Sequence, residues 1–240
     1  MNIIITMAGN GNRFRKVGYN QPKYMIEAKG RSLFEWSLES LKGYAPVVLK
    51  YVFVVRAADN SEHFIADKCA ILGISRYEIV KLDHTTDGQA TTCMEALSCC
   101  EPNDAILIYN IDTYVEAYEM RYEDISGDGH IPCFHAEGEH WSFVKVDNNE
   151  KVTEVREKKR ISDNCTLGAY YFSSVHLYKK LYEEYYADNA RMEKEEKYIA
   201  PMYNYMIEKG YLVTISIVDE KKVHVLGTPE ELRAFIDNKE

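Results

Sequence analysis

The 240-residue sequence has no long apolar run, and its six cysteines include no C-x-x-C pair. The first absence excludes a membrane-spanning helix, and the second excludes a zinc ribbon and the cysteine framework of a small secreted domain. The opening residues MNIIIT also lack the basic segment that precedes the apolar core of a signal peptide, and they are typical of a strand. We therefore expect a cytoplasmic protein with reduced cysteines and no membrane partner.

Basic residues are outnumbered by acidic ones, with 29 Lys and Arg against 38 Asp and Glu. The formal net charge is −9, and the basic residues gather in two places: Arg13, Arg15, Lys16 and Lys23 near the start, and REKKR at 156–160. Proteins that bind nucleic acid usually carry a net positive charge or a basic stripe. An acidic chain with two small basic clusters predicts a small anionic ligand and no nucleic-acid partner.

The loop after the first apolar residues, MAGNGNRF at 7–14, lacks the features of two common phosphate-binding motifs. It has no Gly-Lys-Ser/Thr ending, which excludes a Walker A loop, and Phe14 stands where a dinucleotide-binding loop has its third glycine. The next strand ends at Arg56 instead of the acidic residue that such a fold requires. Gly9 and Gly11 still allow backbone N–H groups to approach an anion closely. We predict a phosphate-binding loop of another kind.

Apolar strands alternate with helices through the first half of the chain. Strands are predicted at 2–6, 51–55, 77–82 and 105–112, with helices at 32–43, at 61–72 and from near Asp87. Ser32 and Glu35 form a capping box at the first helix, Gly43 can supply its left-handed stop, and Gly73 ends the second helix. This alternation predicts a parallel sheet with helices on both faces, whose ligands bind at the carboxyl ends of the strands.

The second half has a different pattern. Strands are predicted at 131–136, 142–147, 151–157, 167–172, 211–218 and 222–226, and tyrosine-rich helices at 174–187 and 195–209. A last helix begins after Thr228, with Pro229 at its first position and Glu231 three residues after the cap. The expected fold class is α/β: a Rossmann-like three-layer α/β/α arrangement whose mainly parallel central sheet continues into a mixed C-terminal half.

Five stretches of the sequence occur in the order found in one enzyme family. They are MAGNGNRF with QPKYMIEAKGRSLFEWSLESL (7–41), TTDG (85–88), NID (110–112), VREKKRISDNCTLGAYYF (155–172) and GTPEEL (227–232). In these stretches the chain resembles the sugar-phosphate nucleotidylyltransferases, of the nucleotide-diphospho-sugar transferase superfamily. The resemblance spans nearly the whole chain.

This resemblance implies one nucleotidyltransferase domain over residues 1–240, with a nucleotide-binding half at 1–112 and an acceptor-binding half at 113–240. It implies Mg²⁺-dependent transfer of a nucleotidyl group from a nucleoside triphosphate to a phosphorylated acceptor, with release of pyrophosphate. Such an enzyme would feed surface polysaccharide or glycoconjugate synthesis.

The resemblance places the nucleotide on the glycine loop and on TTDG. The residues that it implicates are Met7, Ala8, Gly9, Asn10, Gly11, Asn12, Arg13, Thr86 and Gly88. Thr86 and Gly88 would read the edge of the base, with a weak preference for a pyrimidine, although a glycine before a helix is also explained by a turn. As catalytic groups, Arg13 can fork onto phosphate oxygens and Lys23 can neutralise the α-phosphate or the leaving pyrophosphate. The alternative for both cations is an exposed surface position.

Asp112 follows an apolar strand, where a carboxylate can hold Mg²⁺ between phosphates or can simply cap the strand end. The resemblance makes it the catalytic metal aspartate. It also implies that Lys158 binds the acceptor phosphate as a catalytic group, and that Glu157 and Asn164 contact the acceptor. Otherwise REKKR is a solvated charge run, and Lys158 could exchange roles with Lys159.

One position departs from the family pattern. Many relatives carry a second metal aspartate in a W-x-D-x-G-T stretch, and the corresponding VHVLGT has Val225 at that position. Either one aspartate is sufficient, or another acidic residue replaces the second. Asp219, at the end of the strand just upstream, is the nearest candidate.

Several functions stay open at this point. The acceptor is a sugar 1-phosphate or a small non-sugar phosphate such as phosphocholine, in which case the chain is a cytidylyltransferase. The tyrosines of 170–205 either form an aromatic cage for a cationic head group or pack amphipathic helices. A GT-A-type glycosyltransferase would require Asp-x-Asp where the chain has NID. A non-catalytic nucleotide-binding protein is compatible with the missing aspartate, and homo-oligomerisation is left open.

Overall fold

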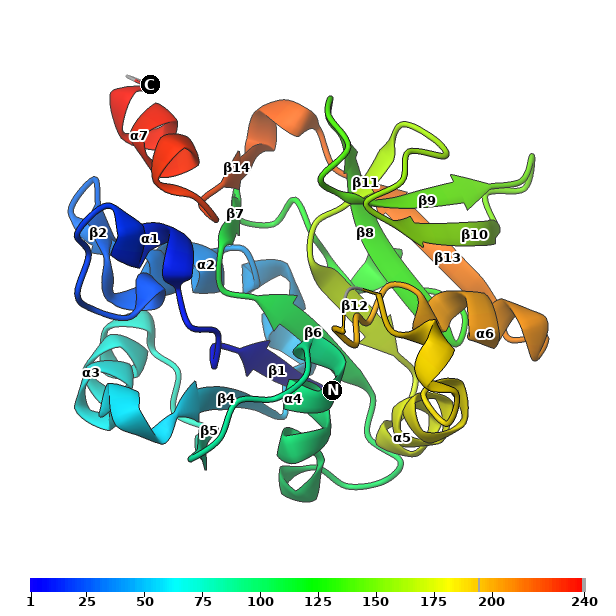
Figure 1. The fold of residues 1–240 in the computed structure, drawn as a ribbon, viewed down its shortest axis with the longest axis horizontal. Coiled ribbons are helices and arrows are strands. Elements are labelled where there is room, and N and C mark those ends of the chain that lie inside the picture. Colours follow the sequence, from blue (N-terminus) through cyan, green and yellow to red (C-terminus); the bar gives the residue numbers. More distant parts are fainter. Residues whose placement is uncertain (194, 239–240) are drawn as a thin grey trace.

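One large sheet runs through both halves of the chain. The computed structural model describes residues 1–193 and 195–238. Its ten-stranded sheet has the order β10-β9-β11-β8-β12-β6-β1-β4-β5, with β13 paired to β8, and Figure 1 shows the helices packed around it. None of the described helices is long and apolar enough to cross a membrane.

The elements have the following bounds. The strands are β1 Asn2–Thr6, β2 Glu27–Ala28, β3 Arg31–Ser32, β4 Lys50–Arg56, β5 Tyr77–Leu82, β6 Ile106–Asn110, β7 Thr113–Val115, β8 Gly129–His135, β9 Ser142–Val146, β10 Val152–Glu157, β11 Asn164–Thr166, β12 Ala169–Phe172, β13 Val213–Ile217 and β14 Val223–Val225. The α-helices are α1 Asn12–Lys16, α2 Leu33–Glu39, α3 Glu62–Leu72, α4 Gln89–Ala96, α5 Val175–Tyr185, α6 Met202–Glu208 and α7 Pro229–Asp237.

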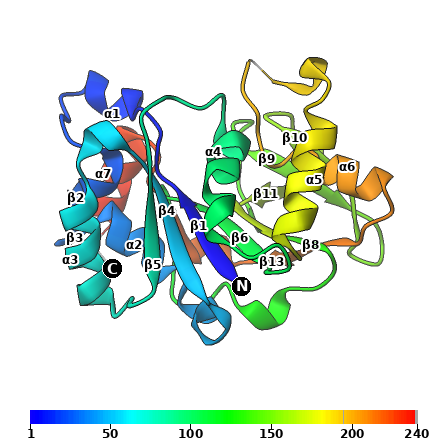
Figure 2. The same cartoon turned by 90° about the horizontal axis from the view of Figure 1, so that it is seen from below.

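The first half forms the parallel part of the sheet, as its alternation predicts. Strands β6, β1, β4 and β5 pair side by side, and each of the three pairings is parallel. Successive residues of β1 face opposite layers: Ile4 packs with Ala90 and Cys93 of α4, whereas Ile3 and Ile5 pack in the cluster of α2 and α3. Figure 2 shows these strands in order, with α2 and α3 on one side and α4 on the other. The predicted α/β class is confirmed.

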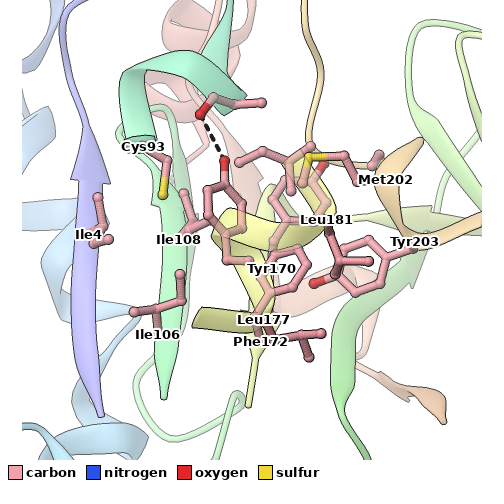
Figure 3. Packing of buried hydrophobic residues seen from close by; sticks show 14 of the residues in the cluster. Ile4, Cys93, Ile106, Ile108, Tyr170, Phe172, Leu177, Leu181, Met202 and Tyr203 are labelled. Carbon is pink, nitrogen blue, oxygen red and sulfur yellow. Dashed lines mark hydrogen bonds between the residues drawn. The ribbon is translucent and has the colours of Figure 1, made fainter. Parts of the chain in front are cut away.

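The second half joins this sheet through an antiparallel strand. β12 pairs antiparallel with β6, and β8 to β11 continue the sheet in antiparallel fashion, while β13 runs parallel to β8. Strands β9 and β10, predicted at 142–147 and 151–157, pair antiparallel with each other. Helices α5 and α6 cover the same face as α4, and Figure 3 shows Phe172, Leu177, Leu181 and Tyr203 in that packed layer.

A small two-stranded sheet carries the last helix to the N-terminal half. β14 pairs antiparallel with β7, which follows the end of β6. From there α7 packs its apolar side, Leu232 and Phe235, into a cluster with Phe14 of α1. Figure 1 shows α7 beside α1 and β2. The last helix therefore lies next to the segment that carries the glycine loop.

Three helix boundaries differ from those predicted. Helix α2 ends at Glu39, and Gly43 is not its left-handed stop. Gly43 is glycine because a Cβ there would lie 2.0 Å from the Met120 carbonyl oxygen. The helix predicted at 195–209 begins only at Met202, and α4 begins at Gln89 after Gly88, whose φ of 140° is outside the helical region.

Candidate active site

A cleft of about 870 Å³ opens at the carboxyl ends of β1 and β6. Both halves of the chain contribute to it. Its walls come from segments 8–14, 85–89, 110–113, 140–142, 157–158 and 166–168, together with Thr6, Lys23, Thr92, Tyr170, Glu195, Glu196, Tyr198, Val225, Gly227 and Glu231. Most residues named from the sequence therefore converge on one site, although they are spread over more than two hundred positions.

The glycine loop forms one wall of the cleft. Gly11 has a φ of 63° and caps α1, a left-handed conformation that favours glycine. The Asn10 side chain accepts a hydrogen bond from Arg56 at 3.1 Å, so the residue that ends β4 fixes the loop. Arg13 is exposed and has no ion pair with any described residue, so its guanidinium is available to an anion. Met7 differs from its neighbours, because its side chain is buried in the core and lines no part of the cleft.

Lys23 and Asp112, which both line the cleft, form an ion pair. Lys23 Nζ lies 2.8 Å from Asp112 Oδ2, and the two side chains are 22% and 28% exposed. Lys23 begins a short 3₁₀ turn after Pro22, and Asp112 follows β6 by two residues. A cation and an anion held together at a half-open surface can exchange this contact for a phosphate and a metal ion, respectively.

Lys158 brings a further positive charge to the cleft from the second half of the chain. Lys158 Nζ lies 3.0 Å from Glu157 Oε1 and donates a hydrogen bond to Tyr198 at 2.9 Å. Burial alone would lower the pKa of Lys158, but the hydrogen bonds to Tyr198 and Glu157 outweigh it and raise the pKa. The ammonium therefore stays charged at neutral pH. Glu157, 8% exposed, also accepts a hydrogen bond from Ser142.

The backbone presents Lys158 in a strained conformation. Its φ is 50°, a left-handed value that a lysine adopts only at a free-energy cost. The Lys158 N–H donates to the Trp141 carbonyl at 2.8 Å, which holds this turn beside the loop before β9. Strain of this kind is common at functional positions, and Lys158 lines the cleft.

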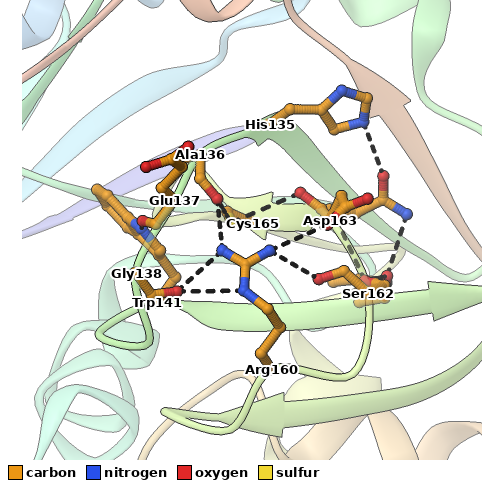
Figure 4. Close-up of polar contacts among 11 residues, drawn as sticks. His135, Ala136, Glu137, Gly138, Trp141, Arg160, Ser162, Asp163 and Cys165 are labelled. Carbon is orange, nitrogen blue, oxygen red and sulfur yellow. Dashed lines mark hydrogen bonds and ion pairs between the residues drawn. The ribbon is translucent and has the colours of Figure 1, made fainter.

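The rest of REKKR is structural or exposed. The Arg160 guanidinium donates hydrogen bonds to the carbonyls of Ala136, Gly138 and Ser162 and forms an ion pair with Asp163 at 3.1 Å. Figure 4 shows this network of polar contacts. Lys159 is exposed and lines no part of the cleft. The run is therefore not a uniform solvated surface, since Lys158 enters the cleft and Arg160 ties two loops together.

Asn164 does not take the position expected of an acceptor ligand. Its side chain donates to the Val144 carbonyl at 3.1 Å and contacts His135 Nε2 at 3.2 Å. These contacts hold β11 between its neighbours in the sheet, and Asn164 is absent from the cleft walls. The family resemblance implied that Asn164 contacts the acceptor, but in the structure its side chain bonds to neighbouring strands of the sheet.

The segment TTDG lies at the far end of the glycine-loop wall. The Thr86 hydroxyl contacts Thr92 at 2.6 Å, which orients it at the start of α4. Gly88 has a φ of 140°, and a Cβ on it would lie 2.4 Å from the Lys197 carbonyl oxygen. Asp87 pairs with Lys197 at 2.8 Å. Both a packing role and a site role are therefore present at Gly88, which lines the cleft as well.

The carboxylates of the cleft fit a divalent cation shared with phosphates. Within the described residues, no three His, Cys, Asp or Glu side chains gather as a complete metal site. Mg²⁺ in phosphate-transfer sites is typically held by one or two carboxylates together with substrate oxygens, so Asp112 suits such an ion. Asp219 does not line the cleft; it caps the turn at 220–222 by accepting the Lys221 N–H. It therefore does not replace the aspartate that is missing at Val225.

Several residues of the cleft were not predicted as site residues from the sequence. Trp141 and Tyr198 belong to no motif, and loops bring them to the site. Gln89 donates a hydrogen bond to Thr6 at 3.2 Å, bridging α4 to the end of β1. Glu231 could have been found only as part of GTPEEL, where its position after Thr228 suggests a helix cap instead.

The tyrosines of 170–205 are mainly packing residues. Tyr178, Tyr186 and Tyr203 are buried in the core, and only Tyr170 and Tyr198 from this stretch line the cleft. Tyr198 is already engaged by the Lys158 ammonium. The arrangement favours helix packing over an aromatic cage for a cationic head group.

Solved structures similar to this chain were found. A nucleoside-diphosphate-sugar pyrophosphorylase from Vibrio cholerae RC9 is 34% identical, superposes with a TM-score of 0.91, and matches over 99% of this chain and 100% of its own. The inositol-1-phosphate CTP transferase from T. maritima shares the fold at 15% identity, with a TM-score of 0.76 over 99% of this chain and 96% of its own. No protein-family model and no curated protein sequence matches the chain.

Proposed function

The chain belongs to the sugar-phosphate nucleotidylyltransferases, and from this membership we propose that it joins a nucleoside monophosphate unit to a small phosphorylated acceptor. An oxygen of the acceptor phosphate attacks the α-phosphorus of a nucleoside triphosphate. The bond from the α-phosphorus to the bridging oxygen breaks, and pyrophosphate leaves with the electron pair. The product is a nucleotide-activated acceptor.

The observation that carries this proposal is the convergence of two separate cationic positions on one cleft. Both reactants are anions, so the protein must offset their repulsion and hold them in line. Arg13 and Lys23 lie on the glycine-loop side, and Lys158 lies on the opposite wall. We assign the first two to the triphosphate and Lys158 to the acceptor phosphate.

The neutral and acidic groups are assigned on the same basis. Thr86 and Gly88 flank the base, for which we propose a pyrimidine, at the start of α4. Glu157, beside Lys158, would accept hydrogen bonds from acceptor hydroxyl groups. For the acceptor we propose a sugar 1-phosphate, because Tyr198 contacts Lys158 and offers no free cage for a quaternary ammonium group. Such a product is a glycosyl donor of the kind that polysaccharide synthesis consumes.

We propose Mg²⁺ as the cofactor, held by Asp112 together with triphosphate oxygens. When bound, it would neutralise charge on the phosphates as pyrophosphate departs. Asp112 has a free carboxylate oxygen as well as the one that Lys23 contacts, so the side chain can serve both. Lys23 is then left to turn its ammonium to the phosphates.

A glycosyltransferase with an Asp-x-Asp metal site is not favoured. The first position of that motif is Asn110, whose side chain accepts a hydrogen bond from Gln89. A neutral amide engaged in this way does not replace a metal-binding carboxylate. Arg13 and Lys23 also have no role in such a reaction.

Pyrophosphate release tests the proposal directly. The protein is incubated with Mg²⁺, each of the common nucleoside triphosphates, and a panel of sugar 1-phosphates and non-sugar phosphates. We expect pyrophosphate only when both a triphosphate and an acceptor are present. If no pair releases pyrophosphate but an added nucleotide sugar is consumed with release of its nucleoside phosphate, the protein is a glycosyltransferase instead. Binding of nucleotide without any turnover would indicate a sensor.

A further inference from the structure

The Glu231 carboxylate has an unusual environment for a residue at the start of a helix. Thr228 caps α7, and its hydroxyl accepts the Glu231 N–H at 3.2 Å, which is half of a capping box. The reciprocal half is missing from the described contacts. Glu231 Oε2 is buried and has no hydrogen-bond partner in the described part of the chain, and the residue lines the cleft.

This carboxylate lies beside Asp112. Gly227 separates them, and an ideal Cβ built on Gly227 would be 3.3 Å from Asp112 Oδ2 and 3.4 Å from Glu231 Oε2. The two distances, 3.3 and 3.4 Å, limit the separation of these two oxygens to about 6.7 Å. A glycine here thus leaves open the space between two acidic side chains.

The backbone fixes this neighbourhood. Val225 on β14 pairs with Thr113 on β7, the residue after Asp112. The Leu226 N–H donates to the Asp112 carbonyl at 2.8 Å, one residue before Gly227. Leu232, which follows Glu231, is buried against the Phe14 cluster. Glu231 and Asp112 are therefore held in a constant relation by strand pairing and by the core.

We propose that Glu231 is the second carboxylate of a divalent-cation site with Asp112, replacing the aspartate that relatives carry where this chain has Val225. The inference rests on the proposed nucleotidyl transfer. A buried carboxylate oxygen without a partner is unfavourable, and a cation is the group that would satisfy it. Mg²⁺ binds carboxylate oxygens at about 2.0–2.1 Å and commonly retains water ligands. Asp112 binds the ion directly, and Glu231 reaches it directly or through one water.

Measuring metal affinity separates a role of Glu231 in metal binding from any effect on catalytic turnover. Mn²⁺ serves as the probe, with free Mn²⁺ followed by electron paramagnetic resonance, alone and with pyrophosphate. Pyrophosphate is the leaving group for every triphosphate, so the experiment does not depend on the base. Loss of an outer-shell partner typically costs about 10–100-fold in metal affinity, so we expect Glu231→Gln and Asp112→Asn each to weaken Mn²⁺ binding by at least about tenfold.

Glu230→Gln is the matched control. Glu230 precedes Glu231 in the same first turn of α7, carries the same charge and is exposed. Its effect on the helix dipole and on net charge is the same, so it should leave Mn²⁺ affinity unchanged. The melting temperature without metal should not fall in Glu231→Gln, since Glu231 Oε2 makes no hydrogen bond there. The rise in melting temperature on adding Mg²⁺ should be lost.

A rescue variant tests whether Glu231 takes the role of the aspartate that is missing at position 225. Val225 lines the cleft at the family's aspartate position, so Val225→Asp added to Glu231→Gln should restore Mn²⁺ binding. Wild-type affinity in Glu231→Gln, or a wild-type protein that retains no Mn²⁺ even with pyrophosphate, overturns the proposal. If Glu231→Gln loses Mn²⁺ but the wild type yields no pyrophosphate with any substrate pair, the metal site stands and the proposed reaction fails.

Discussion

Lys23 and Asp112, 89 positions apart in the chain, form an ion pair of 2.8 Å in the wall of the cleft. Lys23 comes from the turn after the glycine loop and Asp112 from the end of the central strand β6. Neither side chain is fully buried, so each can take another partner without leaving a charge stranded. The pair thus links the groups assigned to the triphosphate with those assigned to the metal.

Loss of the Asp112 carboxylate should nearly abolish turnover. Asp112→Asn keeps the size of the side chain but removes its charge. Removing one group that stabilises charge in a transition state commonly costs about 10²–10³-fold in turnover, or about 3–4 kcal/mol. Pyrophosphate release at saturating substrates, titrated with Mg²⁺, measures the effect. Asp219→Asn is the control, because Asp219 caps a turn outside the cleft. Full activity and unchanged Mg²⁺ dependence in Asp112→Asn would exclude this residue from the mechanism.

Lys158 should act on the acceptor. Lys158→Ala is expected to raise the KM for acceptor and lower turnover by about 10²-fold, because a charge-assisted contact to phosphate is lost. Triphosphate affinity, measured by calorimetry without acceptor, should stay nearly constant. Lys159→Ala is the matched control, since the side chain of Lys159 is next in sequence, exposed and outside the cleft. Damage from Lys159→Ala with a silent Lys158→Ala would reverse the assignment.

Arg13 should act on the triphosphate instead. Arg13→Ala is expected to weaken triphosphate binding by about tenfold or more, which corresponds to about 1.4 kcal/mol for one charge-assisted contact. The KM for acceptor should change little. Arg15→Ala provides the comparison, because Arg15 is two residues along the same short helix, exposed, and absent from the cleft walls. Equal losses in both variants would indicate general electrostatic attraction and not a specific contact.

His130 should make the folded protein sensitive to mild acid. Burial lowers the pKa of His130 from 6.5 to about 4, partly opposed by Asp124. Between these pH values the unfolded chain binds a proton that the folded protein does not, so stability falls as pH drops below 6.5. The loss contributed by this residue is about 2 kcal/mol between pH 6.5 and 5.

Urea unfolding of the wild type and His130→Gln at both pH values measures this contribution. The variant loses hydrogen bonds to Thr214 and Ser216, so it should be less stable than the wild type at both pH values. The informative quantity is the slope of stability with pH, which should be flatter in the variant. Equal slopes would show that His130 is not the group that titrates.

Much of the fold follows from local sequence signals. These signals depend on residues only a few positions apart. They are the apolar strands predicted at 2–6, 77–82 and 105–112, the Ser32–Glu35 capping box and the glycine that ends a helix at Gly73, and the structure contains each of these features. The glycine loop and NID were also placed correctly at strand ends, because parallel strands bring their carboxyl ends to one edge of a sheet.

Local signals failed where a distant backbone decides. Gly43 looked like a helix stop, but its glycine is required by the Met120 carbonyl. Asn164 stands near Lys158 in sequence, but sheet pairing turns its side chain to other partners. Neither contact can be read from neighbouring residues, since each joins positions at least 20 residues apart in the sequence.

By itself, the sequence determined the alternation of strands and helices, the charge of the cleft loops and the family motifs, because these depend on residue types at short spacings. Only the tertiary structure decided which acidic groups face the cleft. Asp219 and Glu231 are both acidic residues beside turns or caps, and the sequence alone favoured Asp219 as the second metal ligand. The pairing of β14 with β7 turns α7 toward Asp112 and leaves Asp219 outside, so the choice was made by strand pairing across more than a hundred residues.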